Sequence, residues 1–231
     1  MKFASYVSSP RDNECVVLLH GLARGALSMS RMERALREAG YCTANVGYPS
    51  RKYPVETLAD IAVSRGLEAC RTQDGVKTVH FVTHSLGGIL LRQYLSQNEI
   101  PELGRVVMLG PPNQGSAAVD ALGVVPGFDW LHGPAGRQLG KGEESVPLRL
   151  GPVDFELGVI AGNRTIDPIT STTLDNPNDG RVTVADTHVE GMKDFAVVEH
   201  SHAFMMRMRR TIDLTIAFLV NGEFGDPSSQ G

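Results

Sequence analysis

Thr83-His84-Ser85-Leu86-Gly87-Gly88 places a serine between two apolar runs, residues 76–82 and residues 89–95. The first run is short and β-branched, which is typical of a buried strand, and the second has apolar residues at helical spacing. A serine on a sharp strand-to-helix turn is held in a strained conformation that exposes its hydroxyl above the sheet. Gly87 is needed because a side chain there would collide with a neighbouring element. The usual motif for such a turn, Gly-x-Ser-x-Gly, has a further glycine two residues before the serine, where this chain has Thr83. We therefore predict that Ser85 is a nucleophile.

A second motif follows another apolar run, residues 15–19, which ends in His20-Gly21-Leu22. Gly21 allows the backbone to turn inward after the strand. The backbone N–H groups of Leu22 and Leu86 are then expected to point at one carbonyl oxygen and to form an oxyanion hole. His20 is interpreted as a structural histidine that bonds to the backbone.

Composition and charge set the broad class. The 231 residues are 42% hydrophobic and 21% charged, as in ordinary globular proteins, and suffice for one sizeable core. The net charge of −4 gives no basic footprint for nucleic acid. Three cysteines, Cys15, Cys42 and Cys70, are an odd number without paired spacing, which argues against a disulfide framework. Together with the lack of a visible signal peptide, this predicts a cytoplasmic protein. No apolar run is long enough to span a membrane.

Strands and helices alternate along the sequence. The expected strands are 3–7, 15–19, 41–47, 76–82, 105–109, 156–161 and 194–198, and the expected helices are 28–39, 55–71, 89–95 and 205–220. This order predicts an α/β fold in one domain, 1–231, with a mainly parallel, doubly wound sheet and helices on both faces. Ligand sites in such sheets lie at the carboxyl ends of the strands. Leu22, Ser85 and Asn113 all follow strand ends and are expected to share that edge.

Residues 113–152 interrupt the alternation. The segment is rich in Gly and Pro but also carries apolar residues, including Phe128 and Trp130. A long connection inside a compact domain is typically functional or disordered, and the apolar content argues against disorder. We interpret it as a small cap whose Asn113, Phe128 and Trp130 contact substrate; the alternative is a surface insertion that packs away from the site. The tail, residues 221–231, is expected to be frayed.

A serine hydroxyl needs a base to remove its proton. In proteins with such a strand-to-helix turn, the serine is followed along the chain first by the acid and then by the histidine. The acid candidates after the strand at 156–161 are Asp167, Asp175, Asp179 and Asp186. Asp179 is favoured because Asn178-Asp179-Gly180 is a tight turn that can project a carboxylate inward; Asp167, before Pro168, is the rival.

The histidine is expected between the last strand and the last helix, where His200 and His202 both fit. His202 is favoured because it lies further into the loop. His80, His132 and His188 fall in other elements and are expected to be structural or exposed. No histidine pair has the spacing of zinc ligands on a helix, so we expect no metal. The predicted reaction of a serine nucleophile needs no other cofactor.

The chain resembles the lipase/esterase-like α/β-hydrolases, including the bacterial type described as acetyltransferases and hydrolases with this fold. The resemblance covers nearly the whole chain, and its specific stretches are Leu18-Leu19-His20-Gly21-Leu22, Thr83-His84-Ser85-Leu86-Gly87, Pro111-Pro112-Asn113-Gln114-Gly115-Ser116, Asn178-Asp179-Gly180 and His202-Ala203-Phe204-Met205-Met206. The family pattern places its acid in the Asp-Gly turn and its histidine before Phe-Met-Met. It thereby implies Asp179 and His202 as partners of Ser85.

Together with the resemblance, these residues predict a serine-dependent carboxylic-ester hydrolase that acts through an acyl-enzyme. The modest size of the apolar segment 113–152 favours short- to medium-chain esters. The expected partner is a small ester or lipid, with no nucleic acid and no integral membrane segment. Two alternatives stay open from the sequence. One is an acyltransferase with the same three residues, and the other is a non-catalytic binding module on the same fold.

Overall fold

A computed structural model describes residues 11–123, 128–165 and 174–225 of the chain, without the side chains of residues 12, 122, 123 and 128–131. The predicted strand at 3–7 lies outside this part. The described strands form one six-stranded sheet, entirely parallel, in the order β2-β1-β3-β4-β5-β6. They are β1 (Arg11–Leu19), β2 (Tyr41–Val46), β3 (Thr78–His84), β4 (Leu103–Leu109), β5 (Leu157–Gly162) and β6 (Asp194–Val198).

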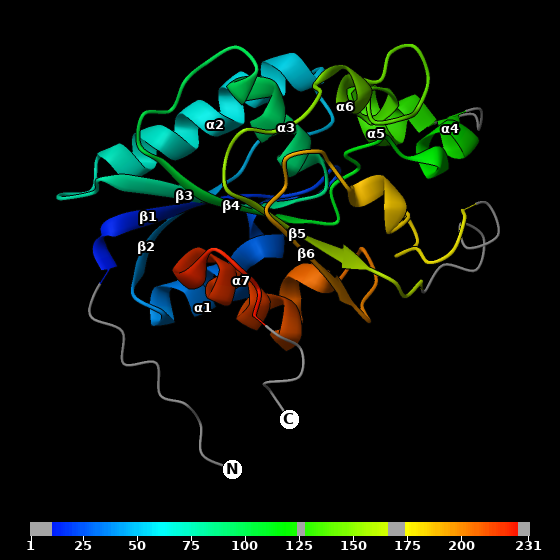
Figure 1. Cartoon of the computed structure of the whole chain (residues 1–231). Coiled ribbons are helices and arrows are strands. Elements are labelled where there is room, and N and C mark those ends of the chain that lie inside the picture. Colours follow the sequence, from blue (N-terminus) through cyan, green and yellow to red (C-terminus); the bar gives the residue numbers. More distant parts are fainter. Residues whose placement is uncertain (1–10, 124–127, 166–173, 226–231) are drawn as a thin grey trace.

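Helices cover both faces of the sheet, as predicted (Figure 1). On one face lie α1 (Ser30–Glu38) and α7 (Arg209–Asn221), and on the other lie α2 (Val55–Arg71) and α3 (Leu86–Leu95). Three short helices, α4 (Ala117–Gly123), α5 (Phe128–Arg137) and α6 (Val146–Arg149), come from the interrupting segment. Single 3-10 turns are formed by Ala26–Met29, Ala185–Thr187 and Met205–Arg207. Within the described residues, no helix is long and apolar enough to cross a membrane.

Successive side chains of each strand contribute to two separate hydrophobic cores, one on each face of the sheet. Val17 and Phe81 belong to the cluster on the α2 and α3 face, whereas Val16 and Val82 belong to the cluster with α1 and α7. Successive strand side chains point to opposite faces, so a strand that is apolar on both sides must be covered twice. This is why the central strands read as continuous apolar runs in the sequence.

The last helix begins later than predicted. Met205–Arg207 is a 3-10 turn, Met208 is extended, and α7 starts at Arg209. The prediction of a frayed tail is wrong for residues 221–225. Gly222 ends α7 in the left-handed conformation, and the buried Phe224 packs on Phe218. Residues 226–231 lie outside the described part.

The interrupting segment is attached to the body by a buried arginine. Arg92 of α3 donates to Asn113 Oδ1 at 2.9 Å and to the carbonyl of Gly151 at 2.6 Å. These two residues lie at opposite ends of the segment. Burial lowers the pKa of Arg92 to about 10, which leaves the guanidinium charged at neutral pH. One side chain therefore fixes both points where the segment leaves and rejoins the sheet.

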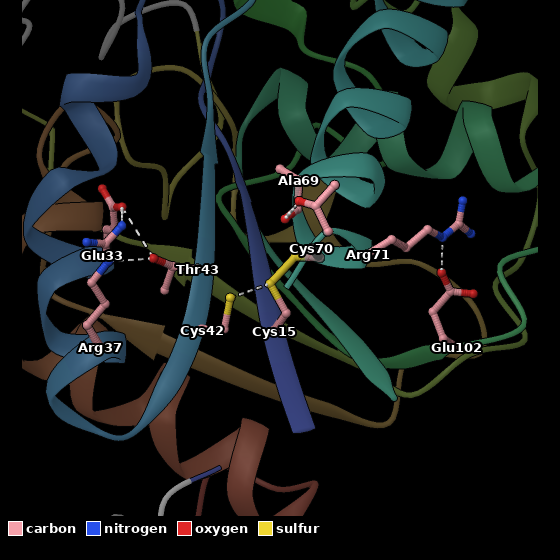
Figure 2. Close-up of a disulfide and its surroundings, with 10 residues drawn as sticks. Cys15, Glu33, Arg37, Cys42, Thr43, Ala69, Cys70, Arg71 and Glu102 are labelled. Atoms are coloured by element: carbon pink, nitrogen blue, oxygen red, sulfur yellow. Dashed lines mark hydrogen bonds and ion pairs between the residues drawn. A yellow bond between two sulfur atoms is a disulfide. The ribbon is translucent and has the colours of Figure 1, made fainter. Parts of the chain in front are cut away.

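The expectation of no disulfide is wrong. Cys15 of β1 and Cys70 of α2 are joined, closing 55 residues of sequence (Figure 2). Cys42 is free, and its Sγ lies 3.2 Å from Sγ of Cys15. Cys42 opposes Cys15 in the β1–β2 register, and α2 packs on both strands. Contacts between distant segments thus bring the sulfurs together, and the cysteine count no longer supports the expected cytoplasmic location.

Candidate active site

The predicted strand-to-helix turn is present at Ser85, between β3 and α3. Ser85 has φ 53° and ψ −119°, a conformation that is costly for any residue with a side chain. The turn is held because the Ser85 N–H donates to the carbonyl of Leu109 at 2.9 Å. A Cβ on Gly87 would lie 2.6 Å from the carbonyl oxygen of Leu19, so glycine is required there for the predicted reason.

The Thr83 side chain is accommodated because Gly88, in the first turn of α3, leaves space for it. The Thr83 side chain is buried, and a Cβ on Gly88 would lie 3.2 Å from its Oγ1. A second glycine within the helix therefore offsets the extra bulk where the usual pattern has glycine on the strand.

Asp179 and His202 meet at the carboxyl edge of the sheet. His202 Nδ1 lies 2.8 Å from Asp179 Oδ2, and the Asp179 side chain is fully buried. The other carboxylate oxygen, Oδ1, accepts from the backbone N–H groups of Arg181 at 2.9 Å and Val182 at 2.8 Å. With Nδ1–H donating to the carboxylate, the neutral ring keeps Nε2 free to accept a proton.

Glycine also makes room beneath this pair. Gly110 follows β4 at φ +54°, and a Cβ there would lie 3.1 Å from both Asp179 Oδ2 and His202 Nδ1. Asp179 further accepts the backbone N–H of His202 through its own carbonyl at 3.0 Å. The loop holding the acid and the loop holding the base are thereby tied by main chain as well as side chain.

The His20-Gly21-Leu22 loop lies against the serine turn. A Cβ on Gly21 would lie 2.8 Å from His84 Nδ1 and 3.3 Å from Ser85 Cβ. His20 Nδ1–H donates to the Gly21 carbonyl at 2.8 Å, and its Nε2 accepts the backbone N–H of Tyr48. Because the carbonyl of Gly21 and the N–H of Leu22 point in opposite directions across one peptide, this bond orients the Leu22 N–H. His20 has the structural role predicted for it.

Backbone strain gathers at this loop. Among the described residues other than glycine, positive φ occurs at Ala23 (55°) and Ser85. The Ala23 N–H donates to Oγ of the buried Ser50 at 3.1 Å, which holds the loop in place. Strained residues of this kind cluster at functional sites.

A hollow of about 430 Å³ contains both Ser85 and His202. Its apolar lining includes Leu22, Pro112, Ala118, Val119, Leu139 and Val182. Its polar lining includes Arg24, His84, Ser116, His132 and Arg181. Leu86 is the first residue of α3, where a helix leaves its N–H groups without partners inside the helix. The structure therefore brings Ser85, His202 and Leu22 to one hollow, with Asp179 behind the histidine.

Asn113 does not line this hollow, and its predicted contact with substrate is wrong. Its amide is buried, with Oδ1 accepting from Arg92 and Nδ2 donating to the carbonyl of Thr187 at 2.8 Å. Both polar ends are thus used within the protein. Phe128 and Trp130 belong to α5, but their side chains lie outside the described part. Asp167 also lies outside it.

Two further histidines line the hollow, although neither was assigned to the site from the sequence. His132 of α5 was expected to be structural or exposed, and it lies in the wall of the hollow. His84, assigned no role from the sequence, also lines the hollow and donates from Nε2 to the carbonyl of His202 at 3.0 Å. Burial, and then the charge of His202, hold the pKa of His84 well below its ordinary value, so the ring is neutral.

The sequence and the fold were compared with those of known proteins. Residues 16–213 match the model of the alpha/beta hydrolase family. No curated protein matches the sequence. Lipase BlEst2 of Bacillus licheniformis, in mature form, has a similar structure, with a TM-score of 0.74, 19% identity, and coverage of 92% of this chain and 95% of that one.

Two further structures share the fold. Phospholipase PlaB from Legionella pneumophila superposes with a TM-score of 0.70 at 19% identity, over 89% of this chain and 60% of its own. Staphylococcus hyicus lipase superposes with a TM-score of 0.64 at 12% identity, over 86% of this chain and 90% of its own. At such identities the likeness shows the fold alone. The match to the family model over most of the sequence shows that the chain belongs to the alpha/beta hydrolase family.

Proposed function

We propose that the protein is a serine-dependent carboxylic-ester hydrolase of the esterase or lipase type. The observation that carries this proposal is the Asp179–His202 pair at 2.8 Å, in which His202 lines the same hollow as the strained Ser85. The fold can be kept without that combination, whereas acyl transfer through a serine needs a base that activates the hydroxyl.

In the proposed reaction, the Ser85 hydroxyl attacks the ester carbonyl while Nε2 of His202 takes its proton. Asp179 holds the ring in the required tautomer and stabilises the imidazolium. The N–H groups of Leu22 and Leu86 stabilise the tetrahedral oxyanion, and one such donor typically contributes about 3–4 kcal/mol to the transition state. His202 then protonates the leaving alcohol, and water, activated by the same histidine, releases the acid.

The hollow supports a substrate of modest size. Its volume of about 430 Å³ and its largely apolar wall fit a short- to medium-chain acyl group. The structures of similar fold include lipases and a phospholipase by name, which favours an ester or a lipid as substrate.

We further propose that residues 113–152 serve as a cap. The segment contributes Ser116, Ala118, Val119, His132 and Leu139 to the wall of the hollow. Arg92 holds both of its ends to the body. An insertion that packed away from the site would not supply these side chains.

A panel of p-nitrophenyl esters from acetate to palmitate tests the proposed activity. We expect the highest kcat/KM for short or medium chains, and we expect Ser85→Ala to lose more than 99% of it. Ser116→Ala is the matched control because Ser116 lines the same hollow, and it should keep more than a tenth of the activity. Full activity in Ser85→Ala would overturn the proposal.

A further inference from the structure

Arg24 lies between two hollows. It follows the oxyanion loop by two residues and lines the hollow that contains Ser85. It also lines an adjoining open hollow of about 510 Å³, whose other lining includes Ser50, Arg51 and Lys52. Arg181, two residues after Asp179, lines the first hollow as well. The first hollow thus combines apolar side chains with two arginines, and the adjoining hollow adds two further cations.

These cations are not neutralised within the part of the chain that the structure describes. Arg105 and Arg149 each bond a glutamate there, but neither Arg24 nor Arg181 forms an ion pair. Burial lowers the pKa of the half-buried Arg24, and the positive charges of Arg207 and Arg181 lower it further. Neighbouring guanidinium groups repel one another, and a bound anion would relieve that repulsion.

The local backbone also fixes Arg24 relative to the serine. Ala23 has φ 55° and donates its N–H to the buried Ser50 Oγ. The loop that carries Leu22 to the hollow therefore also sets the start of the Arg24 side chain. Planar guanidinium groups bind carboxylate and phosphate with paired, charge-assisted hydrogen bonds.

We propose that the ester substrate carries an anionic group, a phosphate or a carboxylate, that binds Arg24 and Arg181 while the ester carbonyl lies at Ser85. The apolar part of the same substrate occupies the hollow under residues 113–152. This inference rests on the proposed ester hydrolase function and names the class of ester.

Matched ester pairs measure the preference. For carboxylate we compare 4-nitrophenyl hydrogen glutarate with 4-nitrophenyl pentanoate, and for phosphate 1-butyrylglycerol 3-phosphate with 1-butyrylglycerol. In at least one pair we expect the anionic ester to have a kcat/KM about tenfold higher or more, since a charged hydrogen bond is lost in its neutral partner. Arg24→Gln and Arg181→Gln should each lower that ratio about tenfold.

Arg65→Gln is the control because Arg65 is exposed on α2 and lines neither hollow. It removes the same charge and should leave the anionic-to-neutral ratio within twofold of wild type. Raising the ionic strength should reduce the wild-type ratio, as expected of an exposed charge pair.

Binding without turnover separates this inference from the proposed function. Calorimetry on Ser85→Ala should detect tighter binding of hexyl phosphate or hexanoate than of hexanol, and Arg24→Gln should abolish the difference. Whichever anion shows the difference identifies the group. Equal binding of all three compounds, with an anionic-to-neutral ratio near one, would overturn the anion site while leaving Ser85-dependent hydrolysis intact. Arg24-dependent binding without hydrolysis of any ester would instead contradict the proposed reaction.

Discussion

At the scale of single residues, the site depends on a strained serine and on small neighbours that permit the strain. A residue such as Ser85 in this conformation costs about 1–3 kcal/mol, so surrounding contacts must hold it. The Leu109 carbonyl bonds its N–H, while Gly21 and Gly87 leave space that a Cβ would fill. We infer that the conformation is kept because it exposes the hydroxyl to His202.

Asp179→Asn tests the proposed acid. The amide can still accept the N–H groups of Arg181 and Val182 through its oxygen, so the turn should fold. It loses the charge and disfavours the tautomer with Nδ1–H, and kcat should fall by about 10⁴. Asp186→Asn is the control because the Asp186 carboxylate pairs with Lys141 instead of with His202. This variant should keep most of the activity. Steady-state kinetics of both variants decide; the reverse ranking would remove Asp179 from the mechanism.

Some of these residues could be predicted because their signals are local. Ser85 is marked by one turn motif, and Asp179 by the Asp-Gly turn. Asn113 follows a strand end as expected, yet its side chain turns to Arg92 and Thr187. The placement of Arg24 beside Arg181 and Arg207 depends on three separate loops. Such contacts between distant segments leave no periodic or motif signal in one sequence.

At the scale of elements, the join between β1, β2 and α2 carries three sulfurs. The Cys15–Cys70 disulfide links the sheet to a helix on one face, and Cys42 lies beside it on the neighbouring strand (Figure 2). A cross-link of this kind stabilises mainly by restricting the unfolded chain.

Reduction of the disulfide should therefore destabilise the protein. For a closed loop of 55 residues, the chain-entropy relation gives up to about 4 kcal/mol. Urea unfolding of oxidised and reduced protein measures this, and thiol titration under denaturing conditions should find one thiol before reduction and three after it. Cys42→Ser is the control and should retain the difference. Three thiols in the untreated protein would contradict the cross-link.

Strands were the most predictable elements because each apolar run ends in turn residues. The helices α4 to α6 could not be placed within residues 113–152, since Gly and Pro interrupt the periodicity there. The cysteine pairing was also beyond the sequence. Three cysteines do not specify which two meet, and the pair forms only when α2 packs on the sheet.

At the scale of the whole molecule, two cores and a parallel sheet direct the strand ends to one edge (Figure 1). The same packing buries three histidines. His20 and His84 are buried, as is His80, which accepts the Arg105 N–H and bonds Glu14. Burial is the main cause that lowers the pKa of each below 6.5.

Stability should consequently fall in mild acid. Below pH 6.5 the histidines bind protons in the unfolded state, whereas the buried histidines of the folded state stay neutral. The free energy of unfolding is therefore highest above pH 6.5 and decreases as the pH falls. From pH 7.5 to 5.5, His84 alone accounts for up to about 1.4 kcal/mol. Urea unfolding at both pH values measures the loss, which should shrink in His84→Gln but persist in His188→Gln, whose side chain is exposed. Equal losses in both variants would refute this assignment.

Reaction with a fluorophosphonate tests the central claim, that Ser85 is a nucleophile activated by His202 and Asp179. Such a probe reacts with a serine only when a base and an oxyanion hole are in place. We expect mass spectrometry to find one label per folded chain, on the peptide that contains Ser85. Heat-denatured protein and Ser85→Ala should carry none, and His202→Ala should react far more slowly. An unlabelled native protein, or a label that persists in Ser85→Ala, would contradict the account.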